Sequence, residues 1–544
     1  MTDWVPGPKG KCIFMGTSSC WAFGRRVLGM THKKLTGGPL LPDHLLFDGH
    51  VHDLKWDGTR INATKDLFNT SNLPTQDHAR YLIDSVKFHC GPLLYLFEES
   101  NFMKQWATFH RDPAQQARAA PLWFCHYLLV LAMGKSLVVQ SARLQRPAGT
   151  DHFVQAMQCM PDLTVFDADP IEKIQVWCCA ALYLQCLNSR TAAYRMIGQA
   201  LRGALEYGMY TEMHSSYLDP TYVQRCKLMW WTVYVLERRM SSLLGVPMGI
   251  AEESISSPFP LTDRNAQGVR ALEMQVMLCQ VLAQIDQTVY GVEGKLDSRY
   301  LGATQSVLRS IAKVAEHLHR SFDLYEHGAT GGISRVSAHL HLLEHQCIVL
   351  TTRPLLYIFL QSKLGQSDPS LMDWLQSETV QGLLHICVES AQQLVRILSN
   401  LLDQGLLDSF LPFDMDAVFT TTISLLMAAA VDPALLPDHS PWSQRAYAIL
   451  EDMIGRGNAS ARLVLSELRQ LDGELAQVFS SEHMAISFTT SHSTESGAGN
   501  GTIGMVPSLA GDGYSEMNFA ESFGPYYELS PGQLTDLANS LDLN

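Results

Sequence analysis

One short run of the sequence has the spacing of metal ligands. His341, Glu344 and His345 follow the pattern H-x-x-E-H. On a helix, two histidines four residues apart lie on one face and can bind the same zinc ion, while the glutamate can act as general base in hydrolysis. The pattern has two free positions in a chain with 20 histidines, and no nearby helix offers a convincing third ligand. We interpret the run as a partly exposed helical face and keep a zinc-dependent hydrolase as the remote alternative.

The composition bears on compartment and on nucleic-acid binding. A formal net charge of −14 over 544 residues opposes contact with DNA by the chain as a whole, so a separate basic module would be needed. The 12 cysteines include no C-x-x-C pair. They also do not show the pattern of paired cysteines that forms the disulfide framework of a small secreted domain. We therefore expect buried thiols in a reducing compartment.

Three long apolar stretches are too short to span a bilayer. Leu122–Met133, Ile174–Leu187 and Phe419–Val431 contain about twelve to fourteen residues each, whereas a spanning helix needs about twenty. The first residues, MTDWVPGPKGKC, lack the apolar core of a signal peptide. We expect interior helices of a soluble cytoplasmic or nuclear protein with no membrane partner.

The hydrophobic pattern predicts an all-α fold. Apolar residues recur at helical spacing in segment after segment, with no sustained alternation of period two. We predict one large multi-helix domain over residues 76–480. A basic, turn-rich and disordered N-terminal arm is predicted over residues 1–75, and a disordered acidic tail over residues 481–544.

A helix pair within Ala193–Pro260 is the most distinctive part of the sequence. Small and apolar residues lie at helical spacing in the first helix. The second is predicted from about Tyr222 to Leu244, because Gly245 can adopt the left-handed conformation that ends a helix and Pro247 cannot continue one.

This stretch resembles the fingerprint of the fungal-specific transcription factor domain, the helical regulatory body of the fungal zinc-cluster transcription factors. The residues that carry the resemblance are Trp230, Trp231, Tyr234, Glu237, Arg239, Gly245 and Pro247. Arg353-Pro354 and the two leucines that follow resemble a second recurring sequence motif of the family. The family usually has Asp at position 237 and Arg at position 246. Since Trp230 and Trp231 cannot face the same way, we interpret the fingerprint as structural, with no catalytic residue.

The resemblance implies a DNA-binding module that the printed chain does not contain. Six cysteines holding two zinc ions should precede the body, but Cys12 and Cys20 are the only cysteines before Cys90. The chain is interpreted either as lacking its first exon or as a regulator that has lost its own DNA reader. We expect no metal or other cofactor in this chain, and zinc only with an upstream cluster.

The resemblance also implies the partners. Promoter DNA would be reached only through a missing or partner-supplied zinc cluster, and the body can form homodimers or heterodimers, bind a small effector or hold the activation tail in check. The segment CGPLLYLFEESNF, which begins at Cys90, resembles an early family segment that lines an effector or partner pocket.

The tail after Ser480 has the composition of an acidic activation domain. It contains no Lys or Arg, and its last part interleaves acidic residues with aromatic and aliphatic ones. Repulsion between the acids keeps such a segment solvated while the apolar groups stay available to coactivators. We expect Gln533–Leu543 to form an amphipathic helix on binding, with Leu534 on its apolar face. The candidate residues are Phe519, Phe523, Tyr526, Tyr527, Leu537 and Leu541.

Together these observations predict a nuclear transcriptional regulator of RNA polymerase II genes and not an enzyme. We expect an activator of a pathway-specific or secondary-metabolite biosynthetic gene cluster. The alternative is a regulatory partner without DNA binding of its own that dimerises with a zinc-cluster factor.

Overall fold

A computed structural model describes most of the chain. It covers residues 3–6, 12–40, 51–52, 54–60, 68–139, 146–163, 168–214, 217–260, 266–290, 299–324, 332–365, 373–490 and 529–541. Side chains are described up to residue 480 in the last long helix.

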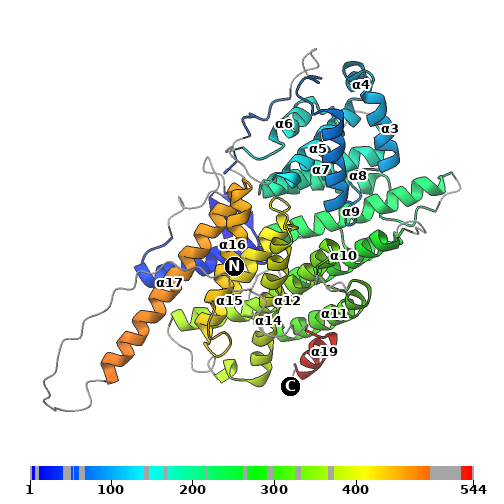
Figure 1. The fold of residues 1–544 in the computed structure, drawn as a ribbon. Coiled ribbons are helices and arrows are strands. Elements are labelled where there is room, and N and C mark those ends of the chain that lie inside the picture. Colours follow the sequence, from blue (N-terminus) through cyan, green and yellow to red (C-terminus); the bar gives the residue numbers. More distant parts are fainter. Residues whose placement is uncertain are drawn as a thin grey trace.

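The described residues form a large α-helical body, as predicted (Figure 1). A short antiparallel hairpin, β1 and β2, precedes the first helix. The elements are β1 (Asp3–Pro6), β2 (Cys12–Met15), α1 (Cys20–Thr36), α2 (Gln76–His89), α3 (Glu99–Phe109), α4 (Pro113–Ala119), α5 (Pro121–Val138), α6 (Thr150–Cys159), α7 (Pro170–Cys186), α8 (Arg190–Glu206), α9 (Pro220–Leu244), α10 (Ala266–Gln284), α11 (Tyr300–Ser321), α12 (Arg335–Leu364), α14 (Glu378–Asp403), α15 (Pro412–Val431), α16 (Ser440–Gly455), α17 (Ala459–Thr490) and α19 (Pro531–Ser540).

The long helix α9 links two groups of helices (Figure 1). Helices α2 to α8 pack together at one end, and α10, α11, α12, α14 and α15 pack together at the other. Helix α9 contacts α7 and α8 on one side and α10 on the other. The fingerprint region therefore lies at the junction of the two groups.

The ends of α9 follow from its sequence and confirm the predicted boundary. The Asp219 side chain accepts a hydrogen bond from the Tyr222 backbone N–H, and Pro220 occupies the first helical position, where no N–H is required. At the other end Gly245 has φ +68°, the left-handed conformation that glycine adopts at low cost.

Two helices are long and apolar enough to cross a membrane by length and composition. They are Pro121–Val138 and Pro412–Val431, and 78% and 94% of their apolar windows are buried inside the protein. Their neighbours cover them on all sides, so they form the centres of the two helix groups, as the sequence predicted for interior helices.

Helix α1 differs from the solvated arm predicted for the N-terminal residues, because it is packed on the body. Helix α1 buries Trp21, Phe23 and Val27 and contacts α9, α12, α15 and α17. Its basic residues Lys33 and Lys34 are exposed in the last turn. The charges of this segment predicted a solvated arm, but its apolar residues lie on the opposite face of α1 and pack against the body.

The connection before α1 lies directly against the end of α9. The Gly16 N–H donates to the Leu244 carbonyl at 2.9 Å, and the Ser19 hydroxyl donates to the Leu243 carbonyl at 2.8 Å. These bonds satisfy carbonyls that a helix end leaves unpaired. A Cβ atom on Gly16 would lie 1.7 Å from the Gly245 carbonyl oxygen, so the backbones can approach this closely only with glycine here.

Replacing Gly16 tests this contact. We expect Gly16→Ala to lower the free energy of unfolding by about 2 kcal/mol or more, because two backbone segments must separate. The matched control is Gly29→Ala in α1, where nothing lies within 4 Å of the new methyl group. That change should leave the protein as stable or raise stability by about 0.5 kcal/mol through helix propensity. Denaturant unfolding measures both, and equal stability of the two variants would contradict the packing described.

Candidate functional site

The aromatic residues of the predicted fingerprint are buried along α9. Trp230 is 0% exposed, Trp231 4% and Tyr234 1%. The Trp231 ring stacks on Phe259 with centroids 4.7 Å apart, and its N–H donates to the Pro258 carbonyl at 3.4 Å. The aromatic residues thus hold the segment that returns after α9 against the helix.

The charged residues of the fingerprint hold the loop that follows α9. The Glu237 carboxylate accepts hydrogen bonds from the Gly249 N–H at 2.7 Å and the Ser241 hydroxyl at 3.0 Å. Arg238 pairs with Glu237 at 2.7 Å and with Glu252 at 2.8 Å. Buried charges are stable only when paired and hydrogen-bonded. The contacts from α9 to Gly249 and Glu252 fix the loop between Gly245 and Glu252. Pro247 lies exposed within that loop.

Arg239 contacts the other helix group. Its guanidinium lies 3.5 Å from the Phe413 ring centroid and 3.2 Å from His339 Nε2. Burial lowers the pKa of Arg239 to about 10, so the side chain stays charged at neutral pH. Burial, together with the nearby Arg239 charge, lowers the pKa of His339 and leaves it neutral. Arg239 therefore joins α9 to α12 by the hydrogen bond to His339 and to the start of α15 by a cation–π contact with Phe413.

Arg353 and Pro354, the second predicted mark, form a buried hydrogen-bond network with Tyr290. Proline inside α12 has no N–H, so it leaves the Leu350 carbonyl without its helical donor. The Tyr290 hydroxyl donates to that carbonyl at 2.9 Å and accepts from Arg353 Nε at 2.7 Å. Arg353 Nη2 also donates to the Ser18 carbonyl at 2.8 Å, which ties the N-terminal segment to α12.

The H-x-x-E-H run lies buried in α12, which corrects the prediction of a partly exposed face. His341 is 2% exposed, Glu344 1% and His345 6%. His341 Nε2 bonds the Phe322 carbonyl at 2.9 Å, and its Nδ1 lies 3.2 Å from Glu344. The position is buried because α11 covers this face of α12, a contact that helical periodicity alone does not show.

The residues that can hold a metal here differ from those that the sequence suggested. His319 from α11 lies 3.2 Å from Glu344, and His319, His341 and Glu344 place ligand atoms within 4.8 Å of one another. His345 is outside this group, and burial lowers its pKa to about 4. Sequence reasoning missed His319 because it lies on a separate helix with no motif. In the structure, His319 and His341 both contact the Glu344 carboxylate, and the three residues form a hydrogen-bonded His–Glu–His cluster.

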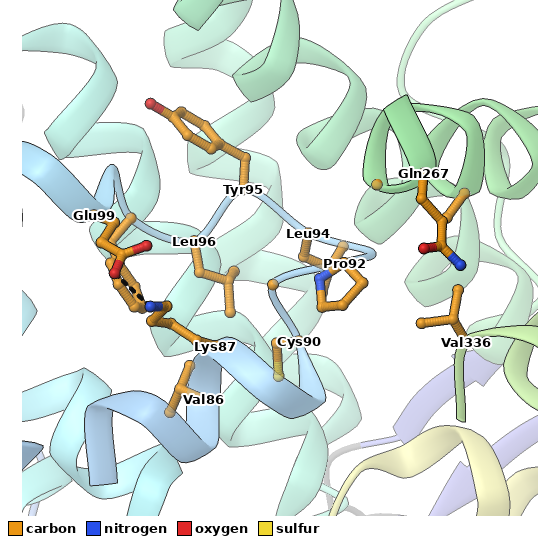
Figure 2. Close-up of a pocket in the computed structure, with 14 residues that line it drawn as sticks. Val86, Lys87, Cys90, Pro92, Leu94, Tyr95, Leu96, Glu99, Gln267 and Val336 are labelled. Carbon is orange, nitrogen blue, oxygen red and sulfur yellow. Dashed lines mark hydrogen bonds and ion pairs between the residues drawn. The ribbon is translucent and has the colours of Figure 1, made fainter. Parts of the chain in front are cut away.

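The segment Cys90–Phe97 lines a cavity of about 460 Å³, a size typical of ligand pockets (Figure 2). This segment begins the stretch whose resemblance implies an effector or partner pocket. Figure 2 shows Pro92, Leu94 and Leu96 facing the cavity between α2 and α10. Ala271 of α10 and Val336 of α12 complete the apolar lining.

The charged groups at this cavity are paired. Lys87 and Glu99 form an ion pair at one end, with both side chains substantially exposed. Beneath the opposite wall, buried Arg335 binds Asp408 at 2.5 Å and Asp414 at 3.0 Å. These pairs fix the walls and leave the cavity suited to an apolar group.

The end of the chain forms a helix that docks on the body. Helix α19 begins with a capping box, in which Ser530 and Gln533 exchange hydrogen bonds, and it packs on α11 and α14 (Figure 1). Leu534 and Leu541 are buried at 0% and 2% exposure. Gln305 of α11 donates to the Ala538 and Leu541 carbonyls at 2.8 and 3.2 Å.

The apolar face predicted for this segment is thus covered by the chain's own body. Leu537 is half-buried, and a Cβ atom on Gly382 of α14 would lie 2.7 Å from its Cδ1 atom. The other candidate activation residues, Phe519, Phe523, Tyr526 and Tyr527, lie outside the described residues.

Comparisons with known proteins found a family match, similar sequences and a similar solved structure. Residues 87–318 match the family described as "Fungal specific transcription factor domain". An uncharacterised transcriptional regulatory protein of Schizosaccharomyces pombe is 21% identical over 481 residues, which cover 86% of this chain and 58% of that protein. Activator of stress genes 1 of Saccharomyces cerevisiae is 25% identical over 211 residues, 37% of this chain and 22% of that protein. Among solved structures, the K. lactis CBF3 core is similar with a TM-score of 0.46 and 12% identity, covering 86% of this chain and 93% of that one.

Residues 87–318 thus match the fungal-specific transcription factor domain, and the similar proteins are fungal transcriptional regulators. These relatives are named as transcriptional regulators and not as enzymes, which agrees with the expectation from the sequence. The chain spans less than two thirds of the length of either relative.

Glu344 offers a test of the His–Glu–His cluster. Burial alone would raise the pKa of Glu344, but hydrogen bonds from His319 and His341 hold it well below the usual 4.5. Because the folded pKa is depressed, the charged form stabilises the fold above pH 4.5, and this contribution is lost as the pH falls further. We expect Glu344→Gln to lower the free energy of unfolding by about 3 kcal/mol at pH 7. The difference from the wild type should shrink below pH 4.5.

Glu316→Gln is the matched control, because Glu316 pairs with Arg320 on the exposed surface of α11. Loss of an exposed ion pair should cost less than about 1 kcal/mol. Denaturant unfolding at several pH values distinguishes the variants. A Glu344→Gln protein as stable as the control at pH 7 would show that the cluster does not stabilise the fold.

Proposed function

We propose that this protein is a nuclear transcriptional regulator that activates RNA polymerase II genes of one biosynthetic pathway or secondary-metabolite cluster. The observation that carries the regulatory assignment is the family match over residues 87–318, which includes α9 at the junction of the two helix groups. The names of the relatives support it. The pathway itself is proposed from the resemblance alone.

Contact with promoter DNA is proposed to come from a zinc cluster outside this sequence or from a partner. The printed chain has only Cys12 and Cys20 before Cys90 and carries a net charge of −14, so its body is a poor DNA-binding surface. The alternative is that this protein has no DNA-binding module of its own and dimerises with a zinc-cluster factor that binds the promoter. Chromatin immunoprecipitation with and without zinc-cluster relatives in the same cell distinguishes the two.

Activation is proposed to reside in the acidic tail. Its aromatic and aliphatic residues are interleaved with acids, and its last helix has an apolar face that a coactivator groove can bind. The structure places that face on α11 and α14, so body and coactivator would compete for Leu534 and Leu541. This competition is how the body would hold the tail in check.

The first prediction for the tail concerns its aromatic residues. We expect residues 505–544, fused to a heterologous DNA-binding domain, to activate a reporter. Phe519→Ala with Phe523→Ala should reduce that activity several-fold, because the apolar groups supply most of the contact area. The matched control removes two acids from the same segment, Glu516→Gln with Glu521→Gln, and should have a smaller effect. Full activity in the double phenylalanine variant would defeat the proposed role of the aromatic residues.

The second prediction concerns release of the docked helix. Gly382→Leu fills the position on α14 where Leu537 packs, and it does so without lowering helix propensity. In the full chain, hydrogen exchange of α19 should rise and reporter activity should increase several-fold. The tail itself is unchanged in this variant, so its affinity for a coactivator is preserved.

Gly473→Leu is the control for that experiment, since Gly473 lies in α17 with nothing within 4 Å of a new Cβ atom. It should alter neither α19 exchange nor reporter activity. Faster exchange of α19 in Gly382→Leu without a rise in activity would reject the proposed restraint of the tail.

A further inference from the structure

The His–Glu–His cluster places three ligand atoms at the contact between α11 and α12. His319 comes from α11, His341 and Glu344 come from α12, and their ligand atoms all lie within 4.8 Å of one another. Both histidines approach the same carboxylate oxygen. Glu344 Oε2 lies 3.3 Å from His319 Nε2 and 3.2 Å from His341 Nδ1. Two imidazole nitrogens and a carboxylate oxygen are the protein ligands of one recurrent type of zinc site.

The other ring nitrogen of His341 holds the ring in the orientation of a metal ligand. His341 Nε2 lies 2.9 Å from the Phe322 carbonyl oxygen, and a carbonyl oxygen only accepts hydrogen bonds. Nε2 therefore carries a proton and donates it, so Nδ1 is the nitrogen that faces Glu344. Histidines that bind metals commonly donate their other ring N–H to a backbone carbonyl in this way. The bond to Phe322 thus selects the tautomer that metal binding requires.

The contact between His341 Nδ1 and Glu344 requires a positive charge. An ionised carboxylate only accepts hydrogen bonds, so a neutral His341 would direct the Nδ1 lone pair at an anion. His341 is 2% exposed and Glu344 1%, so water screens this repulsion poorly. Either a second proton on His341 or a metal ion meets the requirement. A metal ion would in addition bind His319, whose Nε2 approaches the same oxygen.

The spacing and the types of the ligands favour zinc. Ligand atoms around a tetrahedral zinc ion with bonds of about 2.0 Å lie about 3.3 Å apart, close to the two distances to Glu344 Oε2. Calcium and magnesium prefer sets of oxygen ligands, which two histidines do not provide. The His319 side chain is 21% exposed, so solvent reaches this side of the cluster and can supply a fourth ligand.

We infer that His319, His341 and Glu344 form a binding site for one zinc ion, with water as the fourth ligand. The ion links α11 to α12, and α11 also carries the docked helix α19. This inference departs from the expectation that the chain holds no metal. It goes beyond the proposed function, because it concerns metal binding by the helical body and includes no hydrolytic activity.

The test uses the full chain without a histidine tag, after a chelator has removed bound metal. Zinc is titrated in competition with a chromogenic chelator. We expect about one ion to bind per chain with a dissociation constant of about 1 μM or tighter. His319→Ala should weaken this affinity at least about 100-fold, because even the loss of an outer-shell partner costs roughly 10- to 100-fold. Zinc should also raise the melting temperature of the wild type and not that of His319→Ala.

His317→Ala is the matched control, because His317 lies exposed on the same helix and outside the cluster. This variant should bind zinc as tightly as the wild type. Absence of zinc binding by the wild type would overturn the inference, and so would equal zinc affinity of the two variants.

Cobalt in place of zinc tests which atoms bind the metal. We expect the visible spectrum of a tetrahedral cobalt ion with nitrogen and oxygen ligands. A strong thiolate-to-cobalt charge-transfer band would place the metal at cysteines and would also contradict the inference. This spectrum is recorded on the wild type, so it remains decisive even if His319→Ala is unstable.

Discussion

The buried guanidinium of Arg353 joins the parts of the body on which its regulatory region depends. It is 1% exposed, and it donates to the N-terminal segment at Ser18 and to the Tyr290 hydroxyl after α10. A charge at this depth is tolerated only when its donors are satisfied. The two carbonyls involved, at Ser18 and Leu350, belong to irregular or proline-interrupted backbone that would otherwise lack donors. Arg353 and Pro354 therefore act as one unit.

The same principle explains the fingerprint on α9. Glu237 and Arg238 are buried side by side, yet each finds partners in the loop that α9 leads into. Packing of Trp230 and Trp231 supplies apolar area, while these charges select one loop conformation. The loop then meets Gly16, so the fingerprint, the second mark and the N-terminal segment form a continuous structure.

The C-terminal helix, which we propose binds coactivators, is also an internal element of the fold. Its capping box and its apolar face favour a helix on any complementary groove. The groove between α11 and α14 is covalently tethered to it, which gives it a high effective concentration compared with a separate partner. Regulation of such a tail needs only a change in this intramolecular equilibrium.

The all-α class, the limits of α9, the interior helices and the family resemblance could be predicted from the sequence, because these depend on local periodicity, helix-ending residues and spaced motif positions. The sequence also placed the apolar face of the last helix correctly along the chain. What each face contacts follows from the tertiary structure. Helix α1 packs on the body, His341 is buried beside His319 of α11, and the backbone at Gly16 meets the end of α9. These outcomes depend on contacts between residues far apart in sequence, and neither spacing nor composition carries that information.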